Sequence, residues 1–161
     1  MRTFGPVAVG IVAWAVAGAA PPVAPDPLQL ARDIGNEGPA AVVERLWRTG
    51  TYQEVLQQMA SGSKQWVALA PQLAQGADAA AAEGLGIALA EALPRNPASV
   101  LAVLDPARPA LSPARICGVP FIEGTTVDIP AYVRDSTAAV SAVTDDRLQA
   151  AKVACLAALR S

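Results

Sequence analysis

The sequence predicts an all-α domain of stacked antiparallel helix pairs, either a HEAT-like or TPR-like array or an irregular bundle. Apolar residues recur at helical spacing, and the clearest run places Ala81, Leu85, Ala88, Leu89 and Ala92 on one helical face. Glycine or proline separates these runs at short intervals, so the connections between helices are brief. Because no repeat is present in the sequence itself, both the array and the bundle remain open.

The N-terminal segment has the features of a secretory signal peptide. Arg2 precedes an apolar run at 7–20, which is too short to cross roughly 30 Å of hydrocarbon, and Ala17 and Ala19 form a small-residue cleavage site. An uncleaved membrane anchor is the alternative, since the two differ mainly in length. We expect a periplasmic or secreted protein with three segments: a signal peptide at 1–19, a linker at 20–25 and a single helical domain at 26–161.

Two helices are expected at the start of this domain. The first begins at Asp26-Pro27, where the aspartate can cap the helix, and it should end at Gly35. The second begins at Pro39 and ends before Gly50. Trp47 is expected to share the apolar face of the second helix with Val42, Val43 and Leu46.

Two further helices precede the centre of the chain. Thr51 and Glu54 have the spacing of a capping box, which predicts a helix start at this point. Ser63 should cap the next helix, Pro71 should kink or break it, and Gly76 should end it.

The segment 78–104 predicts a helical hairpin at the centre of the fold. Asp78 is expected to cap its first helix and Pro94 to end it. Asn96-Pro97 then begins a second helix, because asparagine caps well and proline is tolerated at the first helical position. Gly84 and Gly86, within the first helix, indicate a close approach of another helix or simple tolerance of glycine.

The chain becomes richer in proline after residue 105. A short helical turn is expected at 113–116, followed by extended chain that includes the β-favouring run 119–122. Helical spacing resumes over 130–143. Thr144 should cap the last helix, and its inward face should carry Leu148, Ala151, Cys155 and Leu159.

The two cysteines, Cys117 and Cys155, predict a disulfide bond. An exported protein with one pair of cysteines most often bridges them. Two buried free thiols and a redox-active pair are the alternatives, and the second is disfavoured because the cysteines are far apart in the chain.

The composition restricts the available chemistry. The chain has no histidine, which removes the usual near-neutral general base and histidine-ligated metals. No metal site or cofactor is expected, and a net charge of −2 argues against nucleic-acid binding. Glu123 and Asp128 are carboxylates that a hydrolase could use, although a solvated loop is the simpler interpretation of this pair.

The segment 118–132 is the candidate binding site, because loops on a rigid scaffold often carry function. Its candidate residues combine large apolar side chains with two carboxylates: Phe121, Ile122, Glu123, Asp128 and Tyr132. The alternative is that Phe121 and Ile122 pack beneath the loop and cover the end of the helices.

Three strings of the sequence, GIALAEALPRNPASVLAVL, CGVPFIE and KVACLAALR, resemble a group of small exported α-helical proteins of proteobacteria. The resemblance covers about 39–160. It agrees with the signal peptide and the paired cysteines, and it implies no activity.

The function expected from these features is non-enzymatic binding of a protein or peptide in the periplasm. A periplasmic inhibitor or immunity protein directed against an envelope enzyme is the alternative, and a carboxylate-based hydrolase is a third possibility. No nucleic acid is expected as a partner, and no membrane once the signal peptide is removed. The oligomeric state is left open.

Overall fold

The computed structural model describes residues 26–121 and 127–161, and within these ranges it is all-helical, without a strand. This confirms the predicted fold class. The expected signal peptide and linker lie outside the described residues. The elements, in chain order, are α1 (Pro27–Glu37), α2 (Pro39–Arg48), α3 (Tyr52–Ala60), α4 (Lys64–Val67), α5 (Ala70–Gly76), α6 (Ala79–Ala92), α7 (Pro97–Leu101), η1 (Pro109–Leu111), α8 (Pro113–Cys117), α9 (Ile129–Ser141), η2 (Asp146–Leu148) and α10 (Gln149–Ala158).

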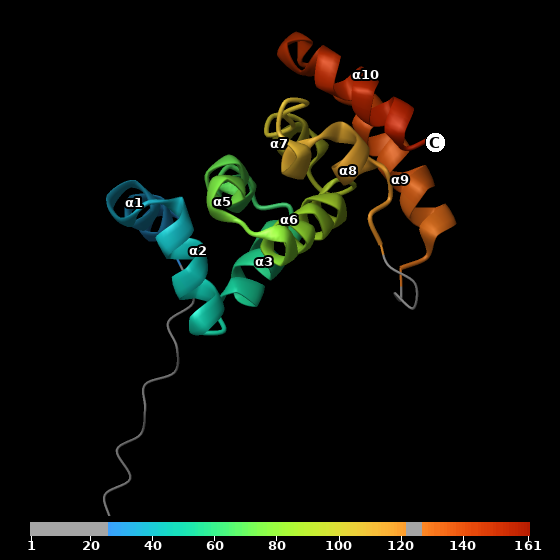
Figure 1. Ribbon diagram of the computed structural model, residues 1–161. Coiled ribbons are helices and arrows are strands. Elements are labelled where there is room, and N and C mark those ends of the chain that lie inside the picture. The colour runs from blue at the N-terminus through green and yellow to red at the C-terminus, as the bar shows by residue number, and fades with distance from the viewer. Residues whose placement is uncertain (1–25, 122–126) are drawn as a thin grey trace, which may run out of the picture.

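The helices progress from α1 and α2 at one end of the molecule to α9 and α10 at the other, with α6 between them (Figure 1). The most extensive contacts join α3 to α6, α2 to α5 and α8 to α10. These partners are not neighbours in the sequence, whereas in a HEAT-like or TPR-like array consecutive helices form the pairs. The repeat-like stacking is therefore not confirmed.

Helix α6 is buried on most of its circumference rather than along one stripe. Consecutive residues Ala88, Leu89 and Ala90 are all buried, and α6 contacts α3, α5, α7, α8 and η1. Gly84 allows α3 to come close, since a Cβ there would lie 2.8 Å from Cδ1 of Leu56. Small residues thus bring the helices around α6 closer than larger side chains would permit.

The predicted caps of the central hairpin are confirmed. Asp78 accepts a hydrogen bond from the backbone nitrogen of Ala81 at 2.8 Å, and Asn96 accepts one from Ser99 at 3.2 Å. The Asn96 side chain also donates to the carbonyl oxygen of Gly62 at 2.8 Å. The connection between α6 and α7 is therefore fixed to the end of α3. Helix α7 ends at Leu101, earlier than the pattern to residue 104 predicts.

One predicted helix end is corrected by the structure, and one predicted break is confirmed. Helix α1 continues through Gly35 to Glu37 and ends at Gly38, which has a φ of 87°. Only a residue with easy access to positive φ ends a helix in this way, so the second glycine is the terminator. Pro71 does break the fourth predicted helix, which becomes α4 and α5.

Three further predictions fail because a local contact replaces the expected one. Trp47 is 49% exposed and stacks on Tyr52, with ring centroids 5.1 Å apart. The capping box does not form: Thr51 has helical backbone angles, and its hydroxyl pairs with that of Thr49 at 2.8 Å. Asp145, not Thr144, caps the C-terminal helical region, and it precedes the 3₁₀ turn η2.

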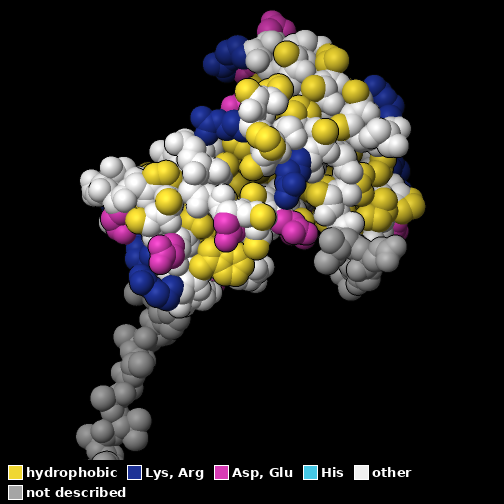
Figure 2. Space-filling model, in the orientation of Figure 1, with side chains coloured by type: hydrophobic (Ala, Val, Ile, Leu, Met, Phe, Trp, Pro, Cys, Tyr) yellow, Lys and Arg dark blue, Asp and Glu magenta, His cyan; other side chains and the backbone are white. Residues whose placement is uncertain are grey.

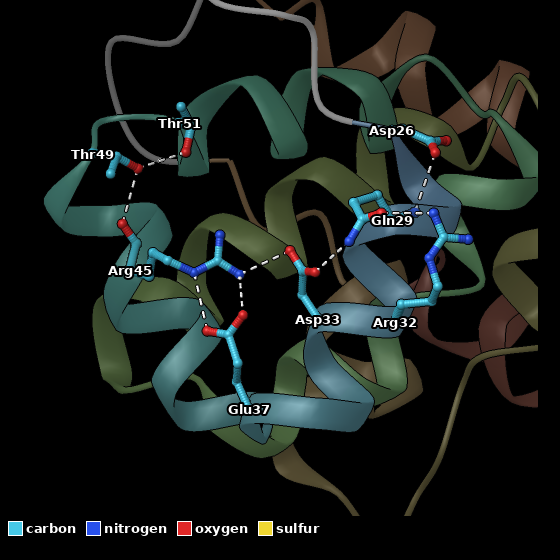
Figure 3. A network of polar contacts seen from close by, with 8 residues as sticks. All are labelled: Asp26, Gln29, Arg32, Asp33, Glu37, Arg45, Thr49 and Thr51. Carbon is cyan, nitrogen blue, oxygen red and sulfur yellow. Dashed lines mark hydrogen bonds and ion pairs between the residues drawn. The ribbon is translucent and has the colours of Figure 1, made fainter.

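A network of polar side chains joins α1 to α2 (Figure 3). The guanidinium of Arg45 on α2 donates to Asp33 at 3.0 Å and to Glu37 at 3.1 and 3.2 Å. Gln29 donates to the other oxygen of Asp33 at 2.7 Å. The bond from Gln29, followed by the contact with Arg45, lowers the pKa of Asp33 below its usual value.

The Cys117–Cys155 disulfide is confirmed, with Cα atoms 5.3 Å apart. It links the end of α8 to α10, and both cysteines are fully buried. The bridge therefore closes the whole segment that contains α9.

The close contact between α2 and α5 predicts that Gly76 cannot be replaced. A Cβ at Gly76 would overlap the backbone of Pro39 and lie 2.5 Å from the nitrogen of Ala40, and neither can move without displacing α2. We expect Gly76→Ala to lower the free energy of unfolding by about 3 kcal/mol or more. Gly35→Ala is the control, because its Cβ, in the last turn of α1, meets nothing within 4 Å. It should raise stability by up to about 1 kcal/mol. Urea denaturation followed by circular dichroism measures both, and equal stabilities would contradict this account.

Removal of the disulfide should destabilise the protein without removing its helices. Replacing both cysteines by serine opens a loop with a sequence separation of 38, which costs about 3–4 kcal/mol in the chain-entropy model. Thermal denaturation with far-ultraviolet circular dichroism checks this. An unchanged melting temperature would contradict it.

Candidate functional site

The structure brings together two of the predicted binding residues, Phe121 and Tyr132. Their rings meet edge to face with centroids 4.8 Å apart, a favourable geometry for an aromatic pair. Phe121 is half-buried, while Tyr132 is buried on α9. Ile122 and Glu123 lie outside the described residues.

Tyr132 has a structural role. Its hydroxyl donates to the carbonyl oxygen of Ala90 on α6 at 3.1 Å. Burial raises the pKa of Tyr132 to about 12; the nearby Ser136 hydroxyl acts in the opposite direction, and the Glu91 charge adds to the increase. The Ser136 oxygen is itself buried, and no described residue is a hydrogen-bond partner of good geometry for it. Tyr132 thus fixes α9 to α6 and supports the ring of Phe121.

Asp128 is accounted for by the start of α9. Its side chain accepts a hydrogen bond from the backbone nitrogen of Ala131 at 3.1 Å, as a helix cap does. The hypothesis of a hydrolase pair would need Glu123, which is not among the described residues.

The backbone approaching Phe121 is constrained. Val119, two residues after Cys117, has a φ of 57°, which a β-branched residue rarely adopts. Its side chain packs against the hydrophobic core, and Cys117 is held by the disulfide. These contacts fix the direction in which the chain reaches Phe121.

Phe121 lies at one end of a groove that sequence reasoning missed. A hollow of about 320 Å³ there is lined by Glu91, Pro94, Arg95, Phe121, Val127 and Tyr132. A second of about 400 Å³ shares Glu91 and Arg95 with it and adds residues of α3. A third of about 180 Å³ continues between α3 and α6, past Leu56 and Ile87 to Glu91. We call these three adjoining hollows the α6 groove.

The walls of the α6 groove are mixed: Gln53, Gln57 and Ser61 line it beside the apolar side chains, together with the charged Glu91 and Arg95. Arg95 donates to the carbonyl oxygens of Ala60 at 2.8 Å and Glu91 at 2.7 Å, so its guanidinium binds backbone acceptors at the ends of both α3 and α6. The carboxylate of Glu91 has no ion pair or hydrogen bond with any residue of 26–121 or 127–161. The i, i+4 spacing of Glu91 and Arg95 would instead have predicted that they pair.

A larger hollow lies elsewhere, between α7 and η2. It measures about 510 Å³, and its lining includes Lys64, Ser99 and Arg147. Arg147 is paired with Asp145 at 2.7 Å, and the lining has no aromatic ring. The α6 groove is the better candidate because an aromatic ring and an unpaired carboxylate face it. In Figure 2 hydrophobic side chains reach the surface over the middle of the molecule, with acidic and basic ones among them.

The two tyrosines predict a loss of stability at alkaline pH. Burial also raises the pKa of Tyr52 to about 12, and its hydroxyl donates to Ala81 of α6 at 2.9 Å. In the unfolded chain each tyrosine ionises near pH 10. The stabilisation is therefore complete below pH 10 and is lost as the pH rises towards 12, by about 1.4 kcal/mol per pH unit for each tyrosine.

Urea denaturation between pH 8 and 12 measures this loss, and Tyr52→Phe and Tyr132→Phe should each make the dependence shallower. Variants with the slope of the parent protein would contradict the assignment.

Comparison of the chain with known protein families, curated proteins and solved structures finds no match. None of the described helices is long and apolar enough to cross a membrane. Within the described ranges, no three histidine, cysteine or acidic side chains gather to hold a metal ion. What the candidate site can bind follows from its own walls: an aromatic ring, aliphatic and uncharged polar side chains, the Arg95 guanidinium and the Glu91 carboxylate.

Proposed function

We propose that this chain is an exported, non-enzymatic protein that binds a segment of another protein or a peptide in the periplasm, through the α6 groove. One observation carries the proposal. The half-buried ring of Phe121 rests edge to face on the buried Tyr132 and lines a hollow that adjoins the rest of the groove. Aromatic side chains held in this way often dominate the binding energy of protein interfaces.

The rigidity of this end of the groove supports binding. Tyr132 is fixed to α6 by its hydroxyl, and the chain before Phe121 is held by the disulfide. A side chain that is already ordered loses little conformational entropy when a partner docks. A mobile ring would lose about 0.5–1.5 kcal/mol more of its binding energy.

The buried disulfide supports the export part of the proposal. Disulfides form and persist in oxidising compartments such as the periplasm, and they are rare in the cytosol. Because both sulfur atoms are enclosed by the core, cellular thiols have poor access to them once the protein has folded.

The substitution Phe121→Ala tests the proposed function. Since the ring is only partly buried, we expect it to lower the free energy of unfolding by about 1–2 kcal/mol, less than the loss of a fully buried phenylalanine. Partner capture per folded molecule should fall at least about tenfold. The immobilised protein and the variant are compared for what each retains from envelope extract of the source cells.

Val153→Ala is the matched control, because Val153 is an exposed apolar residue on α10, outside the groove. It should retain the same partner as the parent protein. Equal capture by Phe121→Ala and the parent, or no specific capture by either, would contradict the proposal.

A further inference from the structure

We infer that the α6 groove selects a partner segment in which a lysine or arginine lies close to a large apolar side chain. This inference rests on the proposed function and specifies the chemistry of its partner. The cation would pair with Glu91, and the apolar side chain would enter the hollow beside Phe121.

The Glu91 carboxylate is available to pair with a partner because the Arg95 guanidinium binds backbone carbonyl oxygens instead. A glutamate followed four residues later by an arginine on a helix usually pairs with it. Here, however, α6 ends before Arg95, and the guanidinium turns to the carbonyl oxygens of Ala60 and Glu91. Both bonds use Nη1 of Arg95, which therefore lies beside Glu91 in the groove but forms no ion pair with its carboxylate, and no other cation of the described residues does so. A positively charged group on the partner would therefore complement the Glu91 carboxylate.

The position of Glu91 makes the charge useful for recognition. It lines all three hollows of the groove, so a segment lying along the groove passes it wherever the segment begins. Glu91 is also half-buried, and a charge pair at such a place is screened less by water than one on the open surface. A neutral segment would cover this carboxylate without compensation, which disfavours it.

The remaining lining indicates how the rest of the segment would lie. Pro94, Phe121 and Tyr132 form the apolar part of the hollow of about 320 Å³ that Glu91 and Arg95 also line, and this part suits one large aliphatic or aromatic side chain. Arg95 lines the same hollow, its Nε and Nη2 donate to no residue of 26–121 or 127–161, and a backbone carbonyl of the segment can accept from them. Together these groups would bind a partner segment that presents a cation, a backbone carbonyl and an apolar side chain close to one another.

A library of random short peptides displayed on phage tests the inference on the folded protein. Enriched peptides should carry lysine or arginine within a few positions of a large apolar residue. A fluorescent synthetic copy of an enriched peptide is then titrated with the parent and with variants, at low and high salt. Glu91→Gln should weaken binding about tenfold and remove most of its salt dependence, while Glu91→Asp, which keeps the charge, should retain that dependence.

Glu83→Gln is the matched control, because it removes the same charge from an exposed position on the same helix outside the groove. It should change affinity by less than about twofold. Circular dichroism of each variant checks that the helices are intact; we expect them to be, since the Glu91 carboxylate makes no hydrogen bond or ion pair with a described residue and its carbonyl oxygen is unchanged in Glu91→Gln.

These outcomes distinguish the inference about the partner's charge from the proposed function. If Phe121→Ala weakens the peptide while Glu91→Gln does not, or if the enriched peptides lack cations, the inference about the partner's charge is wrong and the groove remains a binding site. If no peptide is enriched, or if Phe121→Ala binds as tightly as the parent, both the inference and the proposed function are wrong.

Discussion

The enclosure of α6 is the constraint on which the rest of the structure depends. The helix is made largely of alanine and glycine, so its neighbours come close, and burial extends around most of its surface. Tyr52 from α3 and Tyr132 from α9 donate their hydroxyls to carbonyl oxygens near its two ends. These bonds fix the position along α6 of two helices that are distant in sequence. Apolar packing alone would leave that position poorly defined, because small side chains interlock weakly.

The same arrangement produces the α6 groove. Gly84 allows α3 to lie against one part of α6, and Tyr132 brings α9 to another part. The space left beside these two approaches is lined by Ile87 and Glu91, which α6 presents outward. The groove is therefore a result of how three helices share one central helix, and no single segment encodes it.

Local signals in the sequence predicted much of the fold. The caps at Asp78 and Asn96, the break at Pro71 and the all-helical class are determined by hydrogen bonds and steric clashes within a few residues. The errors arose where two local solutions compete. Gly35 is tolerated inside α1 because a later glycine ends the helix, and Trp47 finds a stacking partner in Tyr52 at the surface.

The candidate site was predicted less completely, for a physical reason. The sequence indicated Phe121 and Tyr132, since large apolar residues in an irregular segment are few, but not that their rings touch. Glu91 was missed because its spacing from Arg95 predicts a routine surface pair. Its availability depends on the carbonyl of Ala60, which is distant in sequence and becomes an acceptor for Arg95 only after folding.

The Cys117–Cys155 bridge also holds the molecule together after cleavage of its backbone. A protease that cuts the chain once at any point between the two cysteines leaves fragments that stay covalently joined, so α10 remains attached to α8. The two fragments of such a cleaved molecule would separate only on exposure to a reductant, so its resistance to dissociation would not depend on the continuity of its backbone.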